Sequence, residues 1–272
     1  MIQVDALIIG AGPIGGYLAK KLCQAGHTVL MIEEHNQIGR PFQCAGLVNP
    51  GSMEKVGLES TALTRIWGAR IHGPGGTLVE IGSPERTRTW SVCRKLFDEA
   101  VVAQAISAGG SLMLNSTPKG TSISDEYVVT TISTDNTELT VKSKVVLGCD
   151  GAHSWVRRYH RMGRVRETMI GFQIDVTGYL HKEGKLDMYT GQQIAPGFFA
   201  WAIPTGTTTR IGTFSRPDLL GGKSSEETLA ELLNHKLWKD RFEGCSEVGR
   251  YCGPVPAKPI KKPAIGRILL FG

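Results

Sequence analysis

The hydrophobic and polar positions of the first 34 residues predict a strand, a helix and a second strand. Residues 6–10 form a short apolar run, and a glycine-rich turn then leads into a segment with apolar side chains at helical spacing. A second run of β-forming residues covers residues 28–32 and ends at two glutamates. Strands that alternate with helices are typical of parallel βαβ units, so the sequence predicts an α/β fold at its start.

Later patterns extend this prediction along the chain. A Gly-Pro-Gly-Gly turn between two β-like runs predicts a hairpin over residues 68–82. Apolar residues on one helical face predict a helix over residues 94–108. Residues 118–146 are rich in Thr, Val and Ser and predict antiparallel strands. We expect residues 146–151 and 264–272 each to form a buried strand that ends in a turn.

The pattern changes between about residues 166 and 250, where β-like runs are broken by Gly and Pro. One helix stands out in this region because it opens with a capping box, from Ser224 to Glu227. The change predicts a second, mostly antiparallel region. The helix is expected to bury the leucines of one face, which are Leu229, Leu232, Leu233 and Leu237.

The composition is that of an ordinary globular protein, with 272 residues, 41% hydrophobic and 21% charged. No apolar run approaches the roughly 20 residues that cross a bilayer, and the N-terminus does not resemble a secretion signal. The six cysteines show no CxxC pair and no histidine at zinc spacing, so we expect reduced thiols and no metal site. The net charge of +6 favours contact with phosphate-bearing cofactors, phospholipid headgroups or nucleic acid, and its sign does not choose among them.

The turn after the first strand, residues 10–15, reads Gly-Ala-Gly-Pro-Ile-Gly and matches the GxGxxG pattern of dinucleotide-binding units. Its first glycine permits a tight turn, its second lets the backbone approach a pyrophosphate, and its third allows close packing of helix on strand. The helix N-terminus supplies free N–H groups, and Glu33 is placed to accept hydrogen bonds from an adenosine ribose. The alternative is a glycine turn without a ligand, and the pattern does not distinguish FAD from NAD. The residues expected to bind the dinucleotide here are Gly10, Gly12, Pro13, Ile14, Gly15, Glu33 and Glu34.

Residues 146–157, Val-Leu-Gly-Cys-Asp-Gly-Ala-His-Ser-Trp-Val-Arg, resemble the Asp-Gly motif of the p-hydroxybenzoate hydroxylase superfamily of flavoproteins. The resemblance implies FAD as the cofactor, with Asp150 and Gly151 beside its pyrophosphate and ribityl chain. A carboxylate at the end of a strand can accept a hydrogen bond from a ribityl hydroxyl or brace the turn. The alternative is a plain turn, in which Asp150 is a turn residue and Ser154 caps a helix.

Two further segments are similar to the geranylgeranyl reductase family within that superfamily. Residues 91–98 resemble its Arg-x-x-Phe-Asp segment, which implies that Arg94 lies near the flavin; the alternative is a solvent-facing cation. Residues 39–46 resemble its Gln-Cys loop, which implies that Cys44 and Ala45 lie beside the isoalloxazine ring.

Cys44 is the candidate catalytic residue. A thiol near a flavin can donate a proton to the substrate or hold a substrate carbon against flavin N5. The alternative is that Cys44 is a small buried hydrophobic residue, which is the commoner fate of a free cysteine.

Residues 196–204, Pro-Gly-Phe-Phe-Ala-Trp-Ala-Ile-Pro, resemble the signature that walls the isoprenoid cavity in geranylgeranyl reductases. Alternation along a strand puts the side chains of Phe199, Trp201 and Ile203 on one face, although such a strand is often plain core. Phe199 replaces the usual Tyr, Ile203 replaces Phe, and Phe214 stands where a second glycine is usual. The resemblance implies a substrate pocket lined by Phe199, Trp201, Ile203 and Pro204.

The same segment is also similar to the WxWxIP signature of flavin-dependent halogenases. A flavin-dependent monooxygenase or halogenase acting on an aromatic substrate is therefore the first alternative function. The Gln-Cys loop favours the reductases. A non-catalytic protein with a flavin-binding fold is the second alternative.

The resemblance implies an α/β fold in which an antiparallel sheet that binds the substrate is inserted into a Rossmann-like FAD-binding domain. In this superfamily the last strand precedes a Gly-Asp-Ala segment and a helix, so we expect the family's C-terminal part to lie outside residues 1–272. The expected FAD-binding domain comprises residues 1–65, 90–162 and 257–272, and the expected substrate domain comprises residues 66–89 and 163–256.

The activity implied by the resemblance is FAD-dependent reduction of the carbon–carbon double bonds of geranylgeranyl chains, in archaeal membrane lipid synthesis. NAD(P)H or a ferredoxin-like protein would supply the reducing equivalents, and an isoprenoid lipid rather than a nucleic acid would be the partner. We expect a cytoplasmic protein, with peripheral contact at the inner face of the membrane as an open alternative. The basic cluster from Arg157 to Arg166 would face lipid headgroups, NADPH phosphates or solvent.

Overall fold

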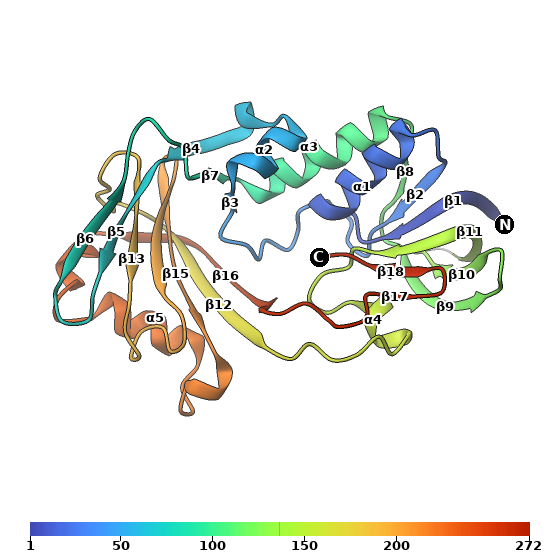
Figure 1. Cartoon of the computed structure of the whole chain (residues 1–272). Helices are drawn as coiled ribbons and strands as arrows, with labels where there is room; N and C mark the ends of the chain where they lie inside the picture. Colours follow the sequence, from blue (N-terminus) through green and yellow to red (C-terminus); the bar gives the residue numbers. More distant parts are fainter. Residues whose placement is uncertain (136) are drawn as a thin grey trace. The chain divides into compact units, whose positions relative to one another are not determined.

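The computed structural model describes residues 1–135 and 137–272, and these divide into two compact units. The first unit consists of Met1–Pro41, Lys95–Arg166 and Lys258–Gly272. The second unit consists of Phe42–Arg94 and Glu167–Ala257. Each unit is built around its own sheets, and most of their strands are labelled in Figure 1.

The first unit contains a sheet with the strand order β17-β18-β11-β1-β2-β8, and β10 and β9 continue from β11. Strand β1 pairs in parallel with both β2 and β11, as the predicted βαβ unit requires. Strand β10 pairs antiparallel with β9 and β11, as predicted for residues 118–146. The strands are β1 (Ile2–Ile9), β2 (Val29–Ile32), β8 (Ser111–Met113), β9 (Thr117–Ile123), β10 (Val128–Ser133), β11 (Glu138–Gly148), β17 (Ala264–Ile265) and β18 (Ile268–Leu270).

Side chains along β1 alternate between two buried cores. Ile8 packs in a core shared with helices α1 (Pro13–Gln24) and α3 (Arg94–Ser107). Leu7 and Ile9 pack in a core shared with β10 and helix α4 (Trp155–Tyr159). Figure 1 shows α1 and α3 on the same side of the sheet. Burial on both faces is why residues 6–9 of β1 and residues 29–32 of β2 are continuously apolar.

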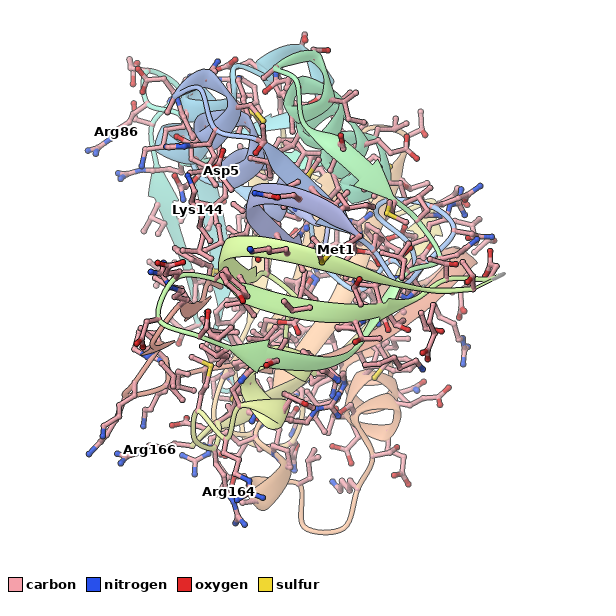
Figure 2. All side chains as sticks on the ribbon, turned by 90° about the vertical axis from the view of Figure 1, so that its right-hand side faces the viewer. Met1, Asp5, Arg86, Lys144, Arg164 and Arg166 are labelled. Carbon is pink, nitrogen blue, oxygen red and sulfur yellow. The ribbon has the colours of Figure 1, made fainter. Side chains whose placement is uncertain are left out.

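An ion pair links the middle of β1 to β11 at the surface. Lys144 Nζ lies 2.7 Å from Asp5 Oδ1, and Figure 2 shows the two side chains beside each other. The Thr28 N–H donates to Asp5 Oδ2 at 2.8 Å. The contacts with Lys144 and Thr28 hold the pKa of the Asp5 carboxyl well below its usual range. This carboxylate therefore connects β1 to β11 on one side and to the residue before β2 on the other.

The second unit contains a sheet with the order β16-β12-β15-β14-β13-β5-β6 and a smaller sheet with the order β3-β7-β4. Its strands pair antiparallel except for β5 and β13, which are parallel. The predicted hairpin is formed by β5 and β6. The strands are β3 (Leu47–Val48), β4 (Ala62–Ile66), β5 (Gly68–His72), β6 (Leu78–Gly82), β7 (Thr89–Val92), β12 (Thr168–Thr177), β13 (Lys185–Tyr189), β14 (Ala200–Thr205), β15 (Thr208–Ser215) and β16 (Ser246–Pro256). The helices are α2 (Pro50–Val56) and α5 (Ser225–Leu233), with the 3-10 helices η1 (Glu59–Thr61), η2 (Pro217–Leu219) and η3 (Lys239–Arg241).

The boundaries of the units differ from the expected domains. Residues 42–65 and 90–94 lie in the second unit, not with the dinucleotide-binding turn. The reason is that β3, β7 and β4 form their own sheet, and Ile66 at the end of β4 is buried with Ile203 of β14. Residues 163–166 lie in the first unit instead of the second. Tertiary packing, rather than proximity in sequence, sets these boundaries.

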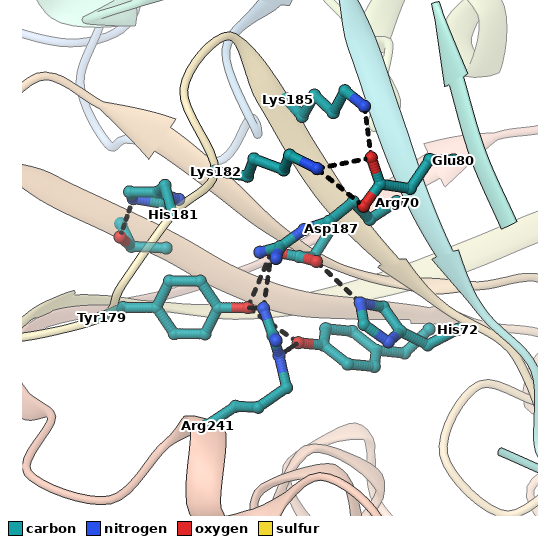
Figure 3. A network of polar contacts seen from close by, with 11 residues as sticks. Arg70, His72, Glu80, Tyr179, His181, Lys182, Lys185, Asp187 and Arg241 are labelled. Carbon is teal, nitrogen blue, oxygen red and sulfur yellow. Dashed lines mark hydrogen bonds and ion pairs between the residues drawn. The ribbon is translucent and has the colours of Figure 1, made fainter. Parts of the chain in front are cut away.

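A buried carboxylate ties several elements of the second unit together (Figure 3). Asp187 is fully buried and accepts hydrogen bonds from Arg70 Nη2 at 2.7 Å, Tyr179 OH at 2.9 Å and Arg241 Nη2 at 3.1 Å. His72 Nε2 lies 2.7 Å from its other oxygen. Burial alone would raise the pKa of Asp187, but the hydrogen bonds from His72 and Arg70 and the charge of Arg241 hold it below its ordinary value.

Helix α5 has the predicted capping box, in which Ser224 Oγ accepts from the Glu227 N–H at 3.1 Å. Two other details of the expected elements are wrong. The helix ends at Leu233, however, so Leu237 lies beyond it and is 44% exposed. The predicted strand over residues 264–272 is instead the antiparallel pair β17 and β18, because the chain reverses at Gly266, whose φ is +54°.

In the described part of the chain, no helix has both the length and the apolar character needed to cross a bilayer.

Candidate functional site

The two glycine turns of the first unit meet at the carboxyl edge of its sheet. Ile9 of β1 lies opposite Gly148 of β11, and the Cys149 N–H donates to the Ile9 carbonyl oxygen at 2.7 Å. A Cβ atom on Gly10 would lie 2.5 Å from the Cys149 carbonyl oxygen, and the φ of Gly10 is +96°. Only glycine meets both conditions without strain. Residues 10–15 and 148–151 therefore form one continuous surface of backbone.

The turn at residues 10–15 is closed toward the protein and open on its outer side. A Cβ on Gly15 would overlap the Gly10 carbonyl oxygen, whereas a Cβ on Gly12 would meet nothing within 4 Å. Gly12 is the N-cap of α1, so the N–H groups of Ile14 and Gly15 have no acceptor inside the helix. Two unpaired N–H groups at the positive end of a helix dipole suit a phosphate group.

Glu33 at the end of β2 braces this turn. Its Oε2 accepts from the Ala11 N–H at 3.0 Å, and its Oε1 lies 2.6 Å from His35 Nδ1. The expected contact of Glu33 with a ribose stays a prediction, while the neighbouring Glu34 is exposed. His35 is not among the residues expected from the sequence, where its position two residues after Glu33 is the available signal.

Asp150 carries an unpaired carboxylate oxygen. Its Oδ2 accepts from the Val156 N–H at 3.0 Å, which braces α4. Its Oδ1 is buried and has no hydrogen-bond partner among the described residues. Ser154 caps α4, because Ser154 Oγ accepts from the Arg157 N–H at 2.9 Å. The cap at Ser154 is therefore present, as in the plain-turn alternative, and the expected contact of Asp150 with FAD stays a prediction.

These features fit a dinucleotide with a polyol chain. A buried acceptor without a donor carries a free-energy penalty, and a ligand hydroxyl would relieve it. The open turn at Gly12 leaves room for a diphosphate at the N–H groups of Ile14 and Gly15. The residues of the first unit therefore fit FAD, with Asp150 toward a hydroxyl and α1 toward the phosphates.

Cys149 lies beside this turn, and its side chain is partly buried. Burial, with a smaller contribution from the charge of Asp150, raises the pKa of Cys149 to about 12. A thiol that stays protonated at neutral pH is a poor nucleophile.

In the second unit, the loop that carries Cys44 is held by buried polar side chains. Gln173 Nε2 donates to the Cys44 carbonyl oxygen at 3.2 Å, and Arg210 Nη1 donates to the Ala45 carbonyl oxygen at 2.8 Å. Arg210 Nε also donates to Asp175 Oδ1 at 2.8 Å, which fixes the guanidinium. Gln173, Asp175 and Arg210 are not among the residues expected from the sequence, although polar residues inside buried strands are a visible signal.

The thiol of Cys44 is only partly buried, and its sulfur acts as a hydrogen-bond acceptor. The Gly46 N–H lies 3.4 Å from Cys44 Sγ. Gly46 has a φ of +74°, and a Cβ there would lie 2.5 Å from the Val92 carbonyl oxygen. Because the sulfur accepts this bond, its own proton is available to another acceptor. The loop thus presents the thiol in one defined position.

The aromatic strand β14 forms the predicted apolar face. Trp201 and Ile203 are buried in one cluster, against which Phe199 packs. Gly212 lies opposite Trp201, and a Cβ on Gly212 would lie 2.6 Å from the indole ring. The ring centroids of Trp201 and Phe214 are 5.0 Å apart in an edge-to-face arrangement.

This cluster also contains an unpaired polar group. Trp201 Nε1 is buried without a hydrogen-bond partner in the described part of the chain. Pro204, the fourth expected pocket residue, is buried on the same strand. Whether these side chains line a substrate pocket stays a prediction.

Arg94 begins α3 and is partly buried, so it is not the freely solvated cation of the alternative interpretation. The expected site residues fall into two groups. The turns with Gly10 to Gly15, Glu33, Asp150 and Gly151 belong to the first unit, and Cys44, Ala45, Arg94 and strand β14 belong to the second. Across residues 1–135 and 137–272, no three His, Cys, Asp or Glu side chains converge as metal ligands would.

Several known proteins are similar to this chain in sequence or in fold. The chain is 26% identical to a digeranylgeranylglycerophospholipid reductase from Methanocaldococcus jannaschii, over 98% of this chain and 69% of that protein. The crystal structure of a geranylgeranyl bacteriochlorophyll reductase-like protein from Thermoplasma acidophilum superposes with a TM-score of 0.87 at 22% identity, over 99% of this chain and 70% of that one. A flavin-dependent brominase superposes with a TM-score of 0.81 at 19% identity, over 99% of this chain and 71% of that one. At these identities the two structural matches establish the fold alone.

The family described as FAD binding domain matches residues 3–211. This range is more than half of the chain, and it contains both glycine turns, the Cys44 loop and strand β14. The chain therefore belongs to the FAD binding domain family.

Proposed function

We propose that the chain is an FAD-dependent oxidoreductase that saturates the double bonds of geranylgeranyl chains in membrane lipids. The observation that carries the proposal is the apolar face of β14, where Trp201 and Ile203 are buried and Phe199 packs against them. A flat apolar wall suits a prenyl chain, which has no polar group to bind. The relationship over nearly the whole chain to a protein named digeranylgeranylglycerophospholipid reductase supports the same substrate.

FAD, when bound, supplies the hydride equivalent that reduces an alkene. The residues of the first unit would hold it: the N–H groups of Ile14 and Gly15 bind its diphosphate, and Asp150 Oδ1 accepts from a hydroxyl. Glu33 orients the turn by accepting from the Ala11 N–H, and we propose that it also accepts from the adenosine ribose. Each of these contacts positions the cofactor without taking part in bond making.

The residues of the second unit would act on the substrate side. An isolated alkene is a weak hydride acceptor, so precise placement and exclusion of water carry much of the rate enhancement. The Trp201 and Phe199 rings would exclude water and hold the chain. Cys44, whose sulfur accepts from Gly46, would donate the proton that the second alkene carbon requires.

The test is anaerobic incubation of the reduced protein with a geranylgeranylated glycerophospholipid, followed by mass spectrometry. We expect products heavier by two hydrogens for each reduced double bond, with NAD(P)H and reduced ferredoxin compared as electron donors. A flavin monooxygenase or halogenase would instead leave the lipid unchanged and yield an oxygenated or halogenated aromatic product. That second outcome would exclude the reductase.

The lipid substrate implies that the protein works at a membrane surface, although no described helix crosses one. We therefore propose a cytoplasmic protein with peripheral contact at the membrane.

A further inference from the structure

The first unit contains a strongly basic cavity that the proposed reaction does not use. Its volume is about 300 Å³, and two segments far apart in sequence line it, residues 161–166 and residues 259–265. Five of its lining residues are cationic: Arg161, Arg164, Arg166, Lys261 and Lys262. Figure 2 shows Arg164 and Arg166 reaching away from the ribbon into solvent.

The lining of this cavity contains no acidic residue. Residues 151–166 and residues 248–272 contain no Asp or Glu. None of the five cations forms an ion pair with a carboxylate of the described residues. Like charges held this close repel one another, and an anion placed between them removes the repulsion. The missing partner of this cavity is therefore an anion from outside the chain.

The shape of the arginine segment is fixed by backbone contacts. The Met162 N–H donates to the Arg157 carbonyl oxygen at 3.0 Å, and Arg157 Nη1 donates to the Gly163 carbonyl oxygen at 3.2 Å. The segment therefore leaves α4 in a defined turn and presents Arg161 and Arg164 outward, both exposed.

The floor of the cavity is apolar. Met162 is buried in the core of the first unit, and Ile260 packs against the same core. Ile265 is 40% exposed within the cavity lining. A site for inorganic phosphate has no use for an apolar floor, whereas a phospholipid carries a phosphate and a hydrocarbon chain on one molecule. We propose that this cavity binds the phosphate headgroup of an anionic membrane lipid, with the start of its chain on the apolar floor.

The inference concerns binding only, so it is tested without turnover. The probes are vesicles of phosphatidylcholine mixed with phosphatidylglycerol and vesicles of phosphatidylcholine alone, with bound protein measured by sedimentation. The test variant is Arg164→Gln/Lys261→Gln, which neutralises one cation of each lining segment. The control variant is Lys21→Gln/Lys119→Gln, which removes the same charge from exposed positions of the same unit outside the cavity.

We expect the protein to bind the anionic vesicles, and the test variant to bind them at least tenfold more weakly, since each basic residue near the surface contributes roughly a fivefold factor. The control variant should lose much less, and thermal melting should show that both variants stay folded. Equal losses in the two variants would mean general charge attraction and would overturn the proposal. A second result would also overturn the proposal. In it, only the test variant loses NADPH binding, measured by calorimetry, while its vesicle binding is unchanged.

Discussion

Gly10 lies directly against Cys149, although 138 residues separate them in sequence: a Cβ on Gly10 would lie 2.5 Å from the Cys149 carbonyl oxygen. The contact brings the GxGxxG turn and the Asp-Gly turn onto one edge of the sheet. It also means that Gly10 and Gly12 of the first turn have different tasks. Gly10 is required by the protein, whereas Gly12 faces open space, so we expect that a need for glycine at this position comes from the bound cofactor.

The pair Gly10→Ala and Gly12→Ala separates these tasks. Gly10→Ala should destabilise the first unit by about 1–3 kcal/mol, because the new methyl group meets backbone at a positive φ. Gly12→Ala should change the free energy of unfolding by about 1 kcal/mol or less. It should nevertheless weaken FAD binding at least tenfold, or ~1.4 kcal/mol, because the methyl group occupies the diphosphate's place. Chemical denaturation and flavin fluorescence titration measure the two effects, and unchanged FAD affinity in Gly12→Ala would place the phosphates elsewhere.

Asp150→Asn should weaken FAD binding by roughly 10-fold to 100-fold, since a hydrogen bond to a charged group contributes about 1.5–3 kcal/mol. The reason is the buried Oδ1, which has no partner among the described residues. Ser154→Ala is the matched control, because it removes the α4 cap at a cost of about 1 kcal/mol in stability without touching the proposed site. If both variants bound FAD like the wild type, Asp150 would be a turn residue only.

Cys44→Ala should retain bound flavin and slow the reduction of the lipid. Cys44 is proposed to donate a proton, and an alanine has none to give. Single-turnover kinetics under anaerobic conditions measure the step directly. Cys252→Ala, at an exposed cysteine, should turn over at the wild-type rate. A wild-type rate in Cys44→Ala as well would remove this thiol from the mechanism.

Asp187→Asn should destabilise the second unit by about 3–5 kcal/mol, because it leaves Arg70 and Arg241 without their buried counter-charge. Thermal or urea unfolding measures the loss, and Glu183→Gln, at an exposed carboxylate, is the control.

The same carboxylate predicts how stability depends on pH. The pKa of Asp187 is lower in the folded protein than its ordinary value near 3.9. Its contribution is therefore fully present above about pH 5 and is lost as the pH falls through the folded pKa. Wild-type stability should drop more steeply than that of Asp187→Asn between about pH 5 and pH 3. Parallel profiles for the two proteins would contradict this role.

The sequence by itself determined the local features of this protein. The turn at residues 10–15, the capping box at Ser224 and the alternating face of β14 all depend on neighbours within a few residues. Backbone conformation and side-chain periodicity act over that range, so they can be inferred from the order of residues.

Only the tertiary structure decided which distant segments meet. Gln173 and Arg210 hold the Cys44 loop, Asp187 pairs with arginines from β5 and η3, and residues 42–65 join the second unit. The partners in these contacts cannot be inferred from residues that lie near one another in sequence, because the free energy of the contacts comes from burial and from charge pairing between distant segments. The basic cavity of the first unit likewise depends on the tertiary structure. Each of its two lining segments, taken alone, is an ordinary exposed run of cations, and only the fold brings the two segments together.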